Sequence, residues 1–403
     1  MAPYQRVVIG LCMLFNLIDG LDVLAMAFTA GSVSTQWHLS GVQTGMLLSA
    51  GLIGMACGSM IAAPVAARYG RLALLVLSLT VSGLGMLASY ISPNYESLLY
   101  LRGVTGLGVG VILVIANVLT YEHASEHWRG LAVALQSGAF ALGAVLCGAL
   151  ANFLNDSAGW RYVFLSGGCM TLGAAVVAML WFRDSQQSIA LIHEAHHPLN
   201  CDAKQRQWRG KAFRHLFSEG QWQQTCTLAS AFFLLMFSFY FVMSWTPTLL
   251  IQNGFSGKNG TAGGILLNAG GMLGALLVGL GANRFGCTKL LLSCLSLNAV
   301  LMVLMVPITR VPGLSIAAGC MTGLLLNGAV AALFSLSPKA FNTPIRTSGV
   351  GLVLATGRLG AILSPVVAGQ LLDAHWKPQS LFSLYAVSLL LASLLLWLPR
   401  RRA

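Results

Sequence analysis

The chain has 403 residues, of which 56% are hydrophobic and 8% are charged, and its formal net charge is +12. Because soluble domains usually contain about 25% charged residues, this composition excludes an ordinary soluble enzyme and indicates a membrane protein with many spans. The nine cysteines are scattered, mostly within apolar stretches, and they predict neither a disulfide framework nor a metal site.

Twelve apolar stretches are long enough to cross a bilayer, since a transmembrane helix needs about 20 residues. We expect all of them to be helices, because the hydrocarbon offers the backbone no hydrogen-bond partners. No cleavable signal peptide is expected. The stretches are 7–29, 43–66, 72–92, 97–121, 131–153, 161–182, 223–246, 261–282, 289–307, 314–336, 347–370 and 380–398.

The first stretch contains "LIDGLDVLAM", in which Asp19 and Asp22 lie one helical turn apart in an otherwise apolar run. A charged residue at the centre of a membrane helix costs about 2.5–3.5 kcal/mol on insertion scales. Two further charges lie inside spans, Arg102 in the fourth and Arg358 in the eleventh. Charges inside spans usually face the bundle interior or a water-filled cavity, so these four residues are the first candidates for function.

Depth along the helices, at about 1.5 Å per residue, suggests how these charges pair. Asp19 and Arg358 both fall near the middle of a hydrocarbon core of about 30 Å, whereas Asp22 and Arg102 fall closer to the outer surface. We therefore expect Asp22 to pair with Arg102, either as a structural ion pair or as part of the transport site. We expect Asp19 to face Arg358 across a central cavity. An anion bound to Arg358 would allow Asp19 to take up a proton, which is the logic of a symporter.

The only long polar stretch, residues 183–222, divides the chain into an N-terminal bundle (1–182) and a C-terminal bundle (223–403) with six spans each. In this linker His193, Glu194 and His197 match the H-E-x-x-H pattern of zinc proteases. Zinc catalysis needs both histidines on one helical face, a third ligand and a substrate cleft. Because the match lies in a short linker, we expect neither a metal site nor a cofactor.

The two halves repeat each other. "AARYG" at 66–70 recurs as "ANRFG" at 282–286, and "ALGAVL" at 141–146 recurs as "RLGAIL" at 358–363, at offsets of 216 and 217. Arg129 corresponds to Arg346 at the same offset. Such internal repeats are typical of secondary transporters. The four intramembrane charges have no charged counterpart in the other half, which separates them from the shared scaffold.

Lysine and arginine are distributed unevenly between alternate loops. With the N-terminus inside, seventeen of the 23 basic residues fall on the cytoplasmic side, four outside and two within helices. The positive-inside rule then predicts that both termini are cytoplasmic. This distribution also explains the net positive charge without a nucleic-acid partner.

Four segments resemble the major facilitator superfamily and, within it, the aromatic acid:proton symporter family, over essentially the whole chain. They are D-G-x-D (Asp19, Gly20, Asp22), R-x-x-x-G-x-x-x-G (Arg102, Gly106, Gly110), "SWTPTLL" in the seventh span and "GRLGAILSP" in the eleventh. The resemblance implies uptake of benzoate-like or hydroxybenzoate-like anions with protons by alternating access. It implies proton coupling by Asp19 and Asp22, and substrate binding by Arg358.

Further candidates for substrate contact are Arg102 and two aromatic residues of the seventh span, Tyr240 and Trp245, which combine a ring with a polar group. The alternative for the aromatic residues is lipid-facing bulk. Amides inside spans can line a cavity or form interhelical hydrogen bonds. They are Asn117, Gln136, Asn268 and Asn327.

The loop after the second span departs from the family pattern G-x-L-A-D-R-x-G-R-R, because Ala67 stands where the family has aspartate. The corresponding position after the eighth span is Asn283. We expect Glu122 to pair with Arg129 or Arg68, or to be a solvated loop charge. The predicted cytoplasmic gate comprises Arg68, Arg71, Glu122, Arg129 and Arg284.

The sequence therefore predicts an all-α membrane protein of the major facilitator fold, with twelve transmembrane helices in two six-helix bundles. The predicted function is not enzymatic: it is proton-coupled import of small aromatic carboxylates by a monomer in the bacterial inner membrane. One alternative is a transporter of the same superfamily for an aliphatic organic acid, a sugar or an exported drug. Another is a membrane-bound metalloenzyme or sensor, against which the lack of a polar domain counts.

Overall fold

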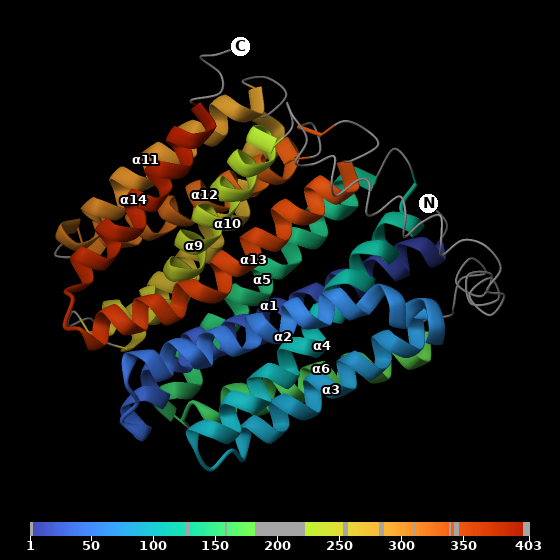
Figure 1. The fold of residues 1–403 in the computed structure, drawn as a ribbon. Helices are drawn as coiled ribbons and strands as arrows, with labels where there is room; N and C mark the ends of the chain where they lie inside the picture. The colour runs from blue at the N-terminus through green and yellow to red at the C-terminus, as the bar shows by residue number, and fades with distance from the viewer. Residues whose placement is uncertain are drawn as a thin grey trace. The chain divides into compact units, whose positions relative to one another are not determined.

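The computed structural model describes residues 3–125, 129–157, 159–181, 222–252, 257–281, 286–308, 312–337, 340–341 and 346–397. A helix lies over every predicted span (Figure 1). In the first half the helices are α1 (Pro3–Trp37), α2 (Gly41–Tyr69), α3 (Arg71–Tyr90), α4 (Tyr95–His123), α5 (Arg129–Ser157) and α6 (Arg161–Trp181). In the second half they are α9 (Trp222–Gln252), α10 (Gly257–Gly281), α11 (Cys287–Ile308), α12 (Pro312–Leu336), α13 (Arg346–Asp373) and α14 (Pro378–Trp397).

Most of these helices have the length and composition of membrane spans. Among the described residues, 10 helices are long and apolar enough to cross a bilayer, whereas α5 and α10 contain the shorter apolar stretches Gly138–Leu154 and Ala262–Val278. Both helices are themselves longer than these stretches, with 29 residues in α5 and 25 in α10. The fold is thus the all-helical one that the sequence predicts.

The end of α1 is the largest difference from the predicted boundaries, because the helix continues to Trp37 instead of ending at residue 29. The added segment is rich in serine and threonine, which are weak helix formers. Thr35 Oγ1 donates to the Gly31 carbonyl within the helix at 2.9 Å, and Ser34 Oγ donates to the Leu39 carbonyl just beyond the helix at 3.4 Å. The Trp160 Nε1 group also donates to Gln36 Oε1 at 2.6 Å. These contacts extend the helix beyond its apolar run.

Two helix starts carry side-chain caps that satisfy exposed backbone groups. Ser40 and Gln43 form a capping box at the start of α2, and Asn94 and Ser97 form one at the start of α4. Each box satisfies two backbone N–H groups that have no partner within the helix. The caps therefore fix where both helices begin.

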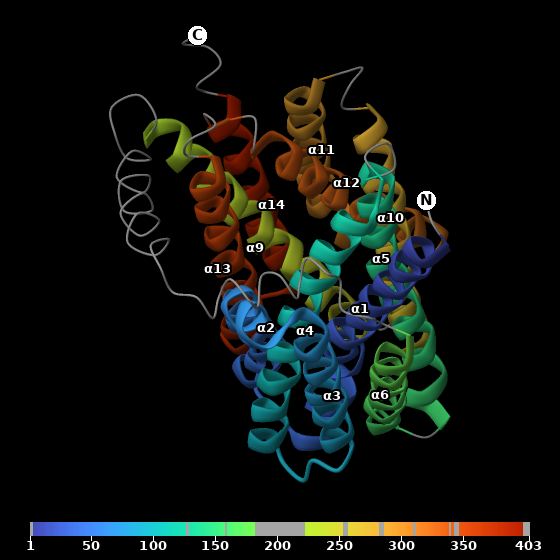
Figure 2. The same cartoon turned by 90° about the vertical axis from the view of Figure 1, so that its right-hand side faces the viewer.

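The described residues form two compact units. Unit 1 contains α1 to α6, the end of α9 from Pro247 and the start of α10 as far as Ile265, and unit 2 contains the remaining helices. Within unit 1, α1 packs against α5, α2 against α4 and α3 against α6 (Figure 2). Within unit 2, α11 packs against α12 and α14 (Figure 1). The predicted bundle boundaries at residues 182 and 223 stay a prediction.

Glycines bring helices close together at equivalent places in both units. A Cβ atom added to Gly106 of α4 would lie 2.1 Å from the carbonyl oxygen of Gly51 in α2. In unit 2, a Cβ added to Gly323 of α12 would lie 1.8 Å from the carbonyl oxygen of Leu267 in α10. The two contacts are related by the repeat offsets of 217 and 216. Because lipid provides no hydrophobic drive between helices, such close packing of small residues stabilises the bundle.

The turns after α2 and α10 share a second repeat-related feature. Gly70 has a φ angle of 89° and Gly286 has one of 84°. Residues with a Cβ atom rarely adopt such values. Gly70 and Gly286 are separated by the repeat offset of 216. The repeat thus extends from the sequence to the backbone conformation.

Candidate functional site

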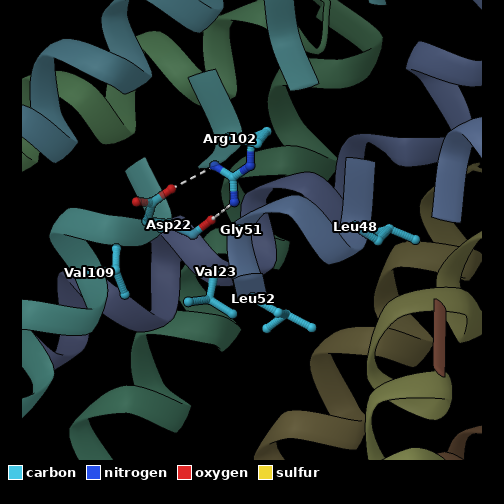
Figure 3. A pocket seen from close by; sticks show the side chains of 8 residues that line it. Asp22, Val23, Leu48, Gly51, Leu52, Arg102 and Val109 are labelled. Atoms are coloured by element: carbon cyan, nitrogen blue, oxygen red, sulfur yellow. Dashed lines mark hydrogen bonds and ion pairs between the residues drawn. The ribbon is translucent and has the colours of Figure 1, made fainter. Parts of the chain in front are cut away.

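Asp22 and Arg102 form a buried ion pair between α1 and α4 (Figure 3). Nη1 of Arg102 lies 2.8 Å from Oδ1 of Asp22, and Nη2 donates to the Asp22 carbonyl oxygen at 3.0 Å. The Arg102 and Asp22 side chains are only 4% and 2% exposed. This pairing confirms the prediction made from depth along the helices. Removal of one partner of such a buried pair typically costs about 3–5 kcal/mol, because it leaves an uncompensated charge.

Two residues that the sequence analysis did not select complete the surroundings of this pair. Ser82 of α3 donates its hydroxyl hydrogen to Oδ2 of Asp22 at 3.0 Å. The guanidinium carbon of Arg102 lies 5.7 Å from the ring centre of Phe164 in α6, within the range of a cation–π contact. Serine and phenylalanine are both common in apolar helices, so composition gives no signal for these two residues. All four helices therefore contribute to one charge-neutral cluster.

A small cavity adjoins the ion pair. It is lined by Asp22, Val23, Leu48, Gly51, Leu52, Arg102, Gly106 and Val109 (Figure 3). Its volume of about 10 Å³ suits a single water molecule and is too small for an aromatic acid. The small residues at positions 51 and 106 let α2 and α4 approach closely beneath the guanidinium group.

Asp19 has different surroundings, although it lies on the same helix. Its side chain is buried at 1% exposure, and Oδ2 has no hydrogen-bond partner among the described residues. The next residue, Gly20, lies against α5, where an added Cβ would be 2.1 Å from the Phe140 carbonyl oxygen. Gly20 thus allows α1 and α5 to approach each other closely. The predicted proximity of Asp19 to Arg358 concerns two different units and stays a prediction.

Unit 2 contains the predicted substrate-binding arginine. Arg358 lies in α13 and is partly buried, and its charge acts on the phenol group of Tyr240 in α9. These two candidate residues are therefore neighbours within one unit. Together they offer a cation and a hydroxyl group, the donors that a carboxylate accepts well.

Trp245 has a structural contact that the sequence does not reveal. Its side chain is 2% exposed, and its indole N–H donates to the carbonyl oxygen of Pro365 in α13 at 3.1 Å. The hydroxyl of Tyr385 in α14 donates to the neighbouring carbonyl of Ser364 at 2.8 Å. These two side chains tie α9 and α14 to α13 beside Pro365, which lies inside that helix and lacks a backbone N–H donor. In this conformation the indole N–H of Trp245 is therefore hydrogen-bonded within the protein.

The predicted cytoplasmic gate is partly described. Glu122 forms an ion pair with Arg71, so the expected pairing with Arg68 is wrong. The Arg68 guanidinium lies 5.3 Å from the ring centre of Tyr69 instead. Because Arg68 and Arg71 flank the same turn, the sequence does not distinguish them. Arg284 and the side chain of Arg129 lie outside the described residues.

The amides in the spans behave in different ways. Asn117 and Asn327 donate to carbonyl groups of their own helices, at Leu113 and Gly323, and within the described part of the chain they form no interhelical bond. Gln136 is fully buried. The H-E-x-x-H match at 193–197 lies outside the described residues, and the described part of the chain contains no group of three or more metal-ligating side chains.

Comparison with known proteins places the chain in a family. The model described as Major Facilitator Superfamily matches residues 11–309 and 268–403. The chain is 31% identical to the 4-hydroxybenzoate transporter PcaK of Pseudomonas aeruginosa, over 94% of this chain and 88% of that protein. It is 29% identical to the 3-(3-hydroxy-phenyl)propionate transporter of Escherichia coli, over 98% of this chain and 94% of that protein.

A solved structure supports the same fold. The crystal structure of a D-xylose-proton symporter superposes with a TM-score of 0.79 at 18% sequence identity, and the match covers 98% of this chain and 97% of that one. These matches confirm the resemblance carried by the four motifs and the prediction of a transporter rather than an enzyme. This chain belongs to the Major Facilitator Superfamily.

Proposed function

We propose that this chain is a proton-coupled symporter that imports small aromatic carboxylates by alternating access. The observation that carries the substrate class is the full-length similarity to two transporters, one named for 4-hydroxybenzoate and the other for 3-(3-hydroxy-phenyl)propionate. Both compounds consist of an aromatic ring, a hydroxyl group and a carboxylate. The predicted cargo of this chain has the same chemistry.

Proton coupling is supported by the surroundings of Asp19. A buried carboxylate with an unpaired oxygen is destabilised in its ionised form by desolvation. Protonation relieves this cost, so the carboxyl group can bind a proton on one side of the membrane and release it on the other. Asp22 contributes by holding Arg102, which keeps a second negative charge one turn away from Asp19 neutralised.

Substrate binding is supported by Arg358 and its neighbour Tyr240. A guanidinium group can donate two parallel hydrogen bonds to a carboxylate, and the phenol can donate a third. We assign the substrate carboxylate to Arg358, and we assign the aromatic ring to the surroundings of Tyr240 and Trp245. Arg102 is a further candidate ligand in an alternative conformation in which its bond to Asp22 is open.

The proposed arrangement in the membrane has twelve spans, with α5 and α10 crossing the bilayer like the other ten helices. Residues 1–182 and 223–403 form the two bundles, with the linker 183–222 and both termini in the cytoplasm of a bacterial cell. The protein is a monomer in the inner membrane. The ion pair of Arg71 and Glu122, with Arg68, Arg129 and Arg284, forms the cytoplasmic gate.

Uptake by purified protein in proteoliposomes tests this function. A panel of labelled aromatic and aliphatic carboxylates is offered with and without an acid-outside pH gradient. We expect at least one aromatic acid to accumulate only with the gradient, and liposomes without protein supply the background. Accumulation of an aliphatic acid or a sugar instead would overturn the substrate class, and equal uptake with and without the gradient would overturn proton coupling.

A further inference from the structure

The end of α9 and the start of α10 belong to unit 1, although the rest of both helices belongs to unit 2. The described parts of these ends are residues 247–252 of α9 and 257–265 of α10, and we call them the latch segment. They contact each other, because a Cβ atom added to Gly263 would lie 2.7 Å from Cδ1 of Leu250. The latch segment is thus attached to unit 1 by packing and to unit 2 through its own helices.

Phe28 of α1 lies where the latch segment packs against the rest of unit 1. Its side chain is buried, at 5% exposure. A Cβ atom added to Gly148 of α5 would lie 2.8 Å from Cζ of Phe28, and one added to Gly264 of α10 would lie 2.6 Å from Cε1. The ring is therefore seated between two glycines, one on each side of the contact, and a larger residue at either position would displace it.

Both helices contain residues that ease bending where the latch segment begins. Pro247 has no backbone N–H, so α9 lacks one hydrogen bond of its regular pattern at that point. Directly before it, α9 is tied to α13 by the bond from Trp245 to the Pro365 carbonyl. In α10, Gly263 and Gly264 lie at the boundary, and glycine lowers helix propensity. Helices bend at such residues, so the latch segment can move while the body of α9 stays on α13.

Phe28 is also placed beyond Asp19 on the same helix. The nine residues from Asp19 to Phe28 correspond to roughly 13 Å along the helix axis. In the proposed orientation, with the N-terminus in the cytoplasm, Phe28 lies between Asp19 and the outer surface. A substrate or proton that enters from outside therefore passes the level of Phe28 before it reaches the level of Asp19.

We propose that Phe28 is a latch residue, whose ring holds the latch segment on α1 and α5 in this conformation and releases it when the outer side opens to substrate. The segment then moves about Pro247 and the two glycines of α10. This inference rests on the proposed function and names the contact that separates in each transport cycle. An apolar ring seated against glycines suits this role, because hydrophobic contact is non-directional and separates without the loss of a specific bond.

A disulfide across the contact tests whether it has to open. A Cβ atom added to Gly31 of α1 would lie 3.9 Å from both Cγ2 and Oγ1 of Thr248 in α9. The double variant Gly31→Cys/Thr248→Cys, in a cysteine-free background, therefore places two thiols within reach of a disulfide. We expect oxidation to abolish uptake of the aromatic acid into proteoliposomes and a reducing agent to restore it. Formation of the disulfide with uptake unchanged would overturn the inference.

Labelling of Thr248→Cys in intact cells measures opening of the contact without any substrate. Thr248 is 6% exposed, so a membrane-impermeant thiol reagent should react with this cysteine slowly. Phe28→Ala removes the ring, and we expect it to raise the labelling rate at least about fivefold. Gly148→Ala should raise the rate as well, because its added Cβ would lie only 2.5 Å from Cγ1 of Ile265 and the segment has to shift.

Matched controls separate opening of the latch from unfolding. Gly138 lies on the same helix as Gly148, and an added Cβ has no neighbouring atom within 4 Å, so Gly138→Ala should leave the labelling of Thr248→Cys unchanged. Thr171 of α6 is 1% exposed and lies outside the latch contact, so Thr171→Cys should stay unlabelled when Phe28→Ala is added.

The labelling result is independent of transport, which separates the failure of this inference from the failure of the proposed function. Equal labelling rates of Thr248→Cys with and without Phe28→Ala would overturn the latch. A wild-type protein that accumulates no aromatic acid under the pH gradient would overturn the proposed function instead.

Discussion

Asp19 and Asp22 lie one turn apart on the same helix, yet their surroundings give them different roles. Asp22 accepts hydrogen bonds from Arg102 and Ser82, so its negative charge is compensated in the folded protein. Asp19 is equally buried and has an unpaired oxygen. Substitution of the two carboxylates is therefore expected to affect different properties: transport energetics at Asp19 and stability at Asp22.

Asp19→Asn is expected to abolish accumulation driven by the pH gradient while leaving the protein folded and inserted. The amide has the same shape but cannot carry a proton. Counterflow, which needs no net proton movement, should persist. The check is labelled substrate in proteoliposomes with and without the gradient; undiminished accumulation would contradict the role of Asp19.

Asp22→Asn is expected to lower the free energy of unfolding by about 3–5 kcal/mol, because Arg102 is left as an unpaired buried charge. The double variant Asp22→Leu/Arg102→Met should recover most of this loss, since it removes both charges. Thermal unfolding of the purified variants in detergent measures both effects. A double variant no more stable than Asp22→Asn would show that the ion pair is not what holds α1 to α4.

Arg358→Lys is expected to raise the KM for the aromatic acid at least tenfold. Lysine keeps the charge but loses the planar pair of donors that matches a carboxylate. Initial uptake rates over a range of substrate concentrations measure the effect. An unchanged KM would show that the substrate carboxylate does not bind to Arg358.

At the residue scale, the sequence predicts the ion pair of Asp22 and Arg102 but not the residues that surround it. Charges in apolar spans are conspicuous, and helix depth alone predicts the partner of Asp22. Ser82 and Phe164 are common residues of apolar helices, so only the packing of α3 and α6 reveals their contacts. The predicted pairing of Glu122 with Arg68 is wrong because Arg68 and Arg71 flank the same turn, and the packing of the helices decides which of them Glu122 contacts.

At the scale of helices, the α2–α4 contact depends on glycine. Gly106 faces the Gly51 backbone, whereas Gly103, on the same helix, has no atom within 4 Å of an added Cβ. Gly106→Ala is expected to lower stability by about 1–3 kcal/mol through overpacking, and Gly103→Ala should be neutral or slightly stabilising. Thermal unfolding compares the two, and equal effects would contradict a glycine-dependent crossing.

Helix existence is predictable here because each span is a long apolar run, and the bilayer permits no other open structure. Helix ends are less predictable when polar residues continue a helix past its apolar part. The segment of α1 after residue 29 is an example, since contacts of Gln36 and Trp37 with Trp160 extend it beyond the apolar region.

At the scale of the whole molecule, the two units share a scaffold but differ in charge. The repeat offset of 216 relates Asp22 to Ser238. Ser238 makes only neutral contacts: its hydroxyl donates to the Tyr385 carbonyl at 2.9 Å and lies 2.5 Å from the Ser388 hydroxyl. The buried ion pair thus belongs to unit 1, while Arg358 belongs to unit 2. We expect proton binding and anion binding to be divided between the repeats.

The orientation of the whole chain can be tested with cysteine reporters in a cysteine-free background. The substitution Pro93→Cys places a reporter between α3 and α4, and Ser125→Cys places one directly after α4. In intact cells, a membrane-impermeant thiol reagent should label the first and not the second, because the basic loops are expected inside. Labelling of Ser125→Cys alone would show that the chain has the opposite orientation in the membrane.

The ion pair between Asp22 and Arg102 also has a consequence for biosynthesis. Its two members are 80 positions apart in the chain, so α1 leaves the ribosome well before the arginine that neutralises it. At about 5–20 residues per second, the first helix waits roughly 4–16 s with two uncompensated carboxylates. We therefore expect the packing of α4 against α1 to be an early step in the maturation of the transporter, because Arg102 then neutralises Asp22.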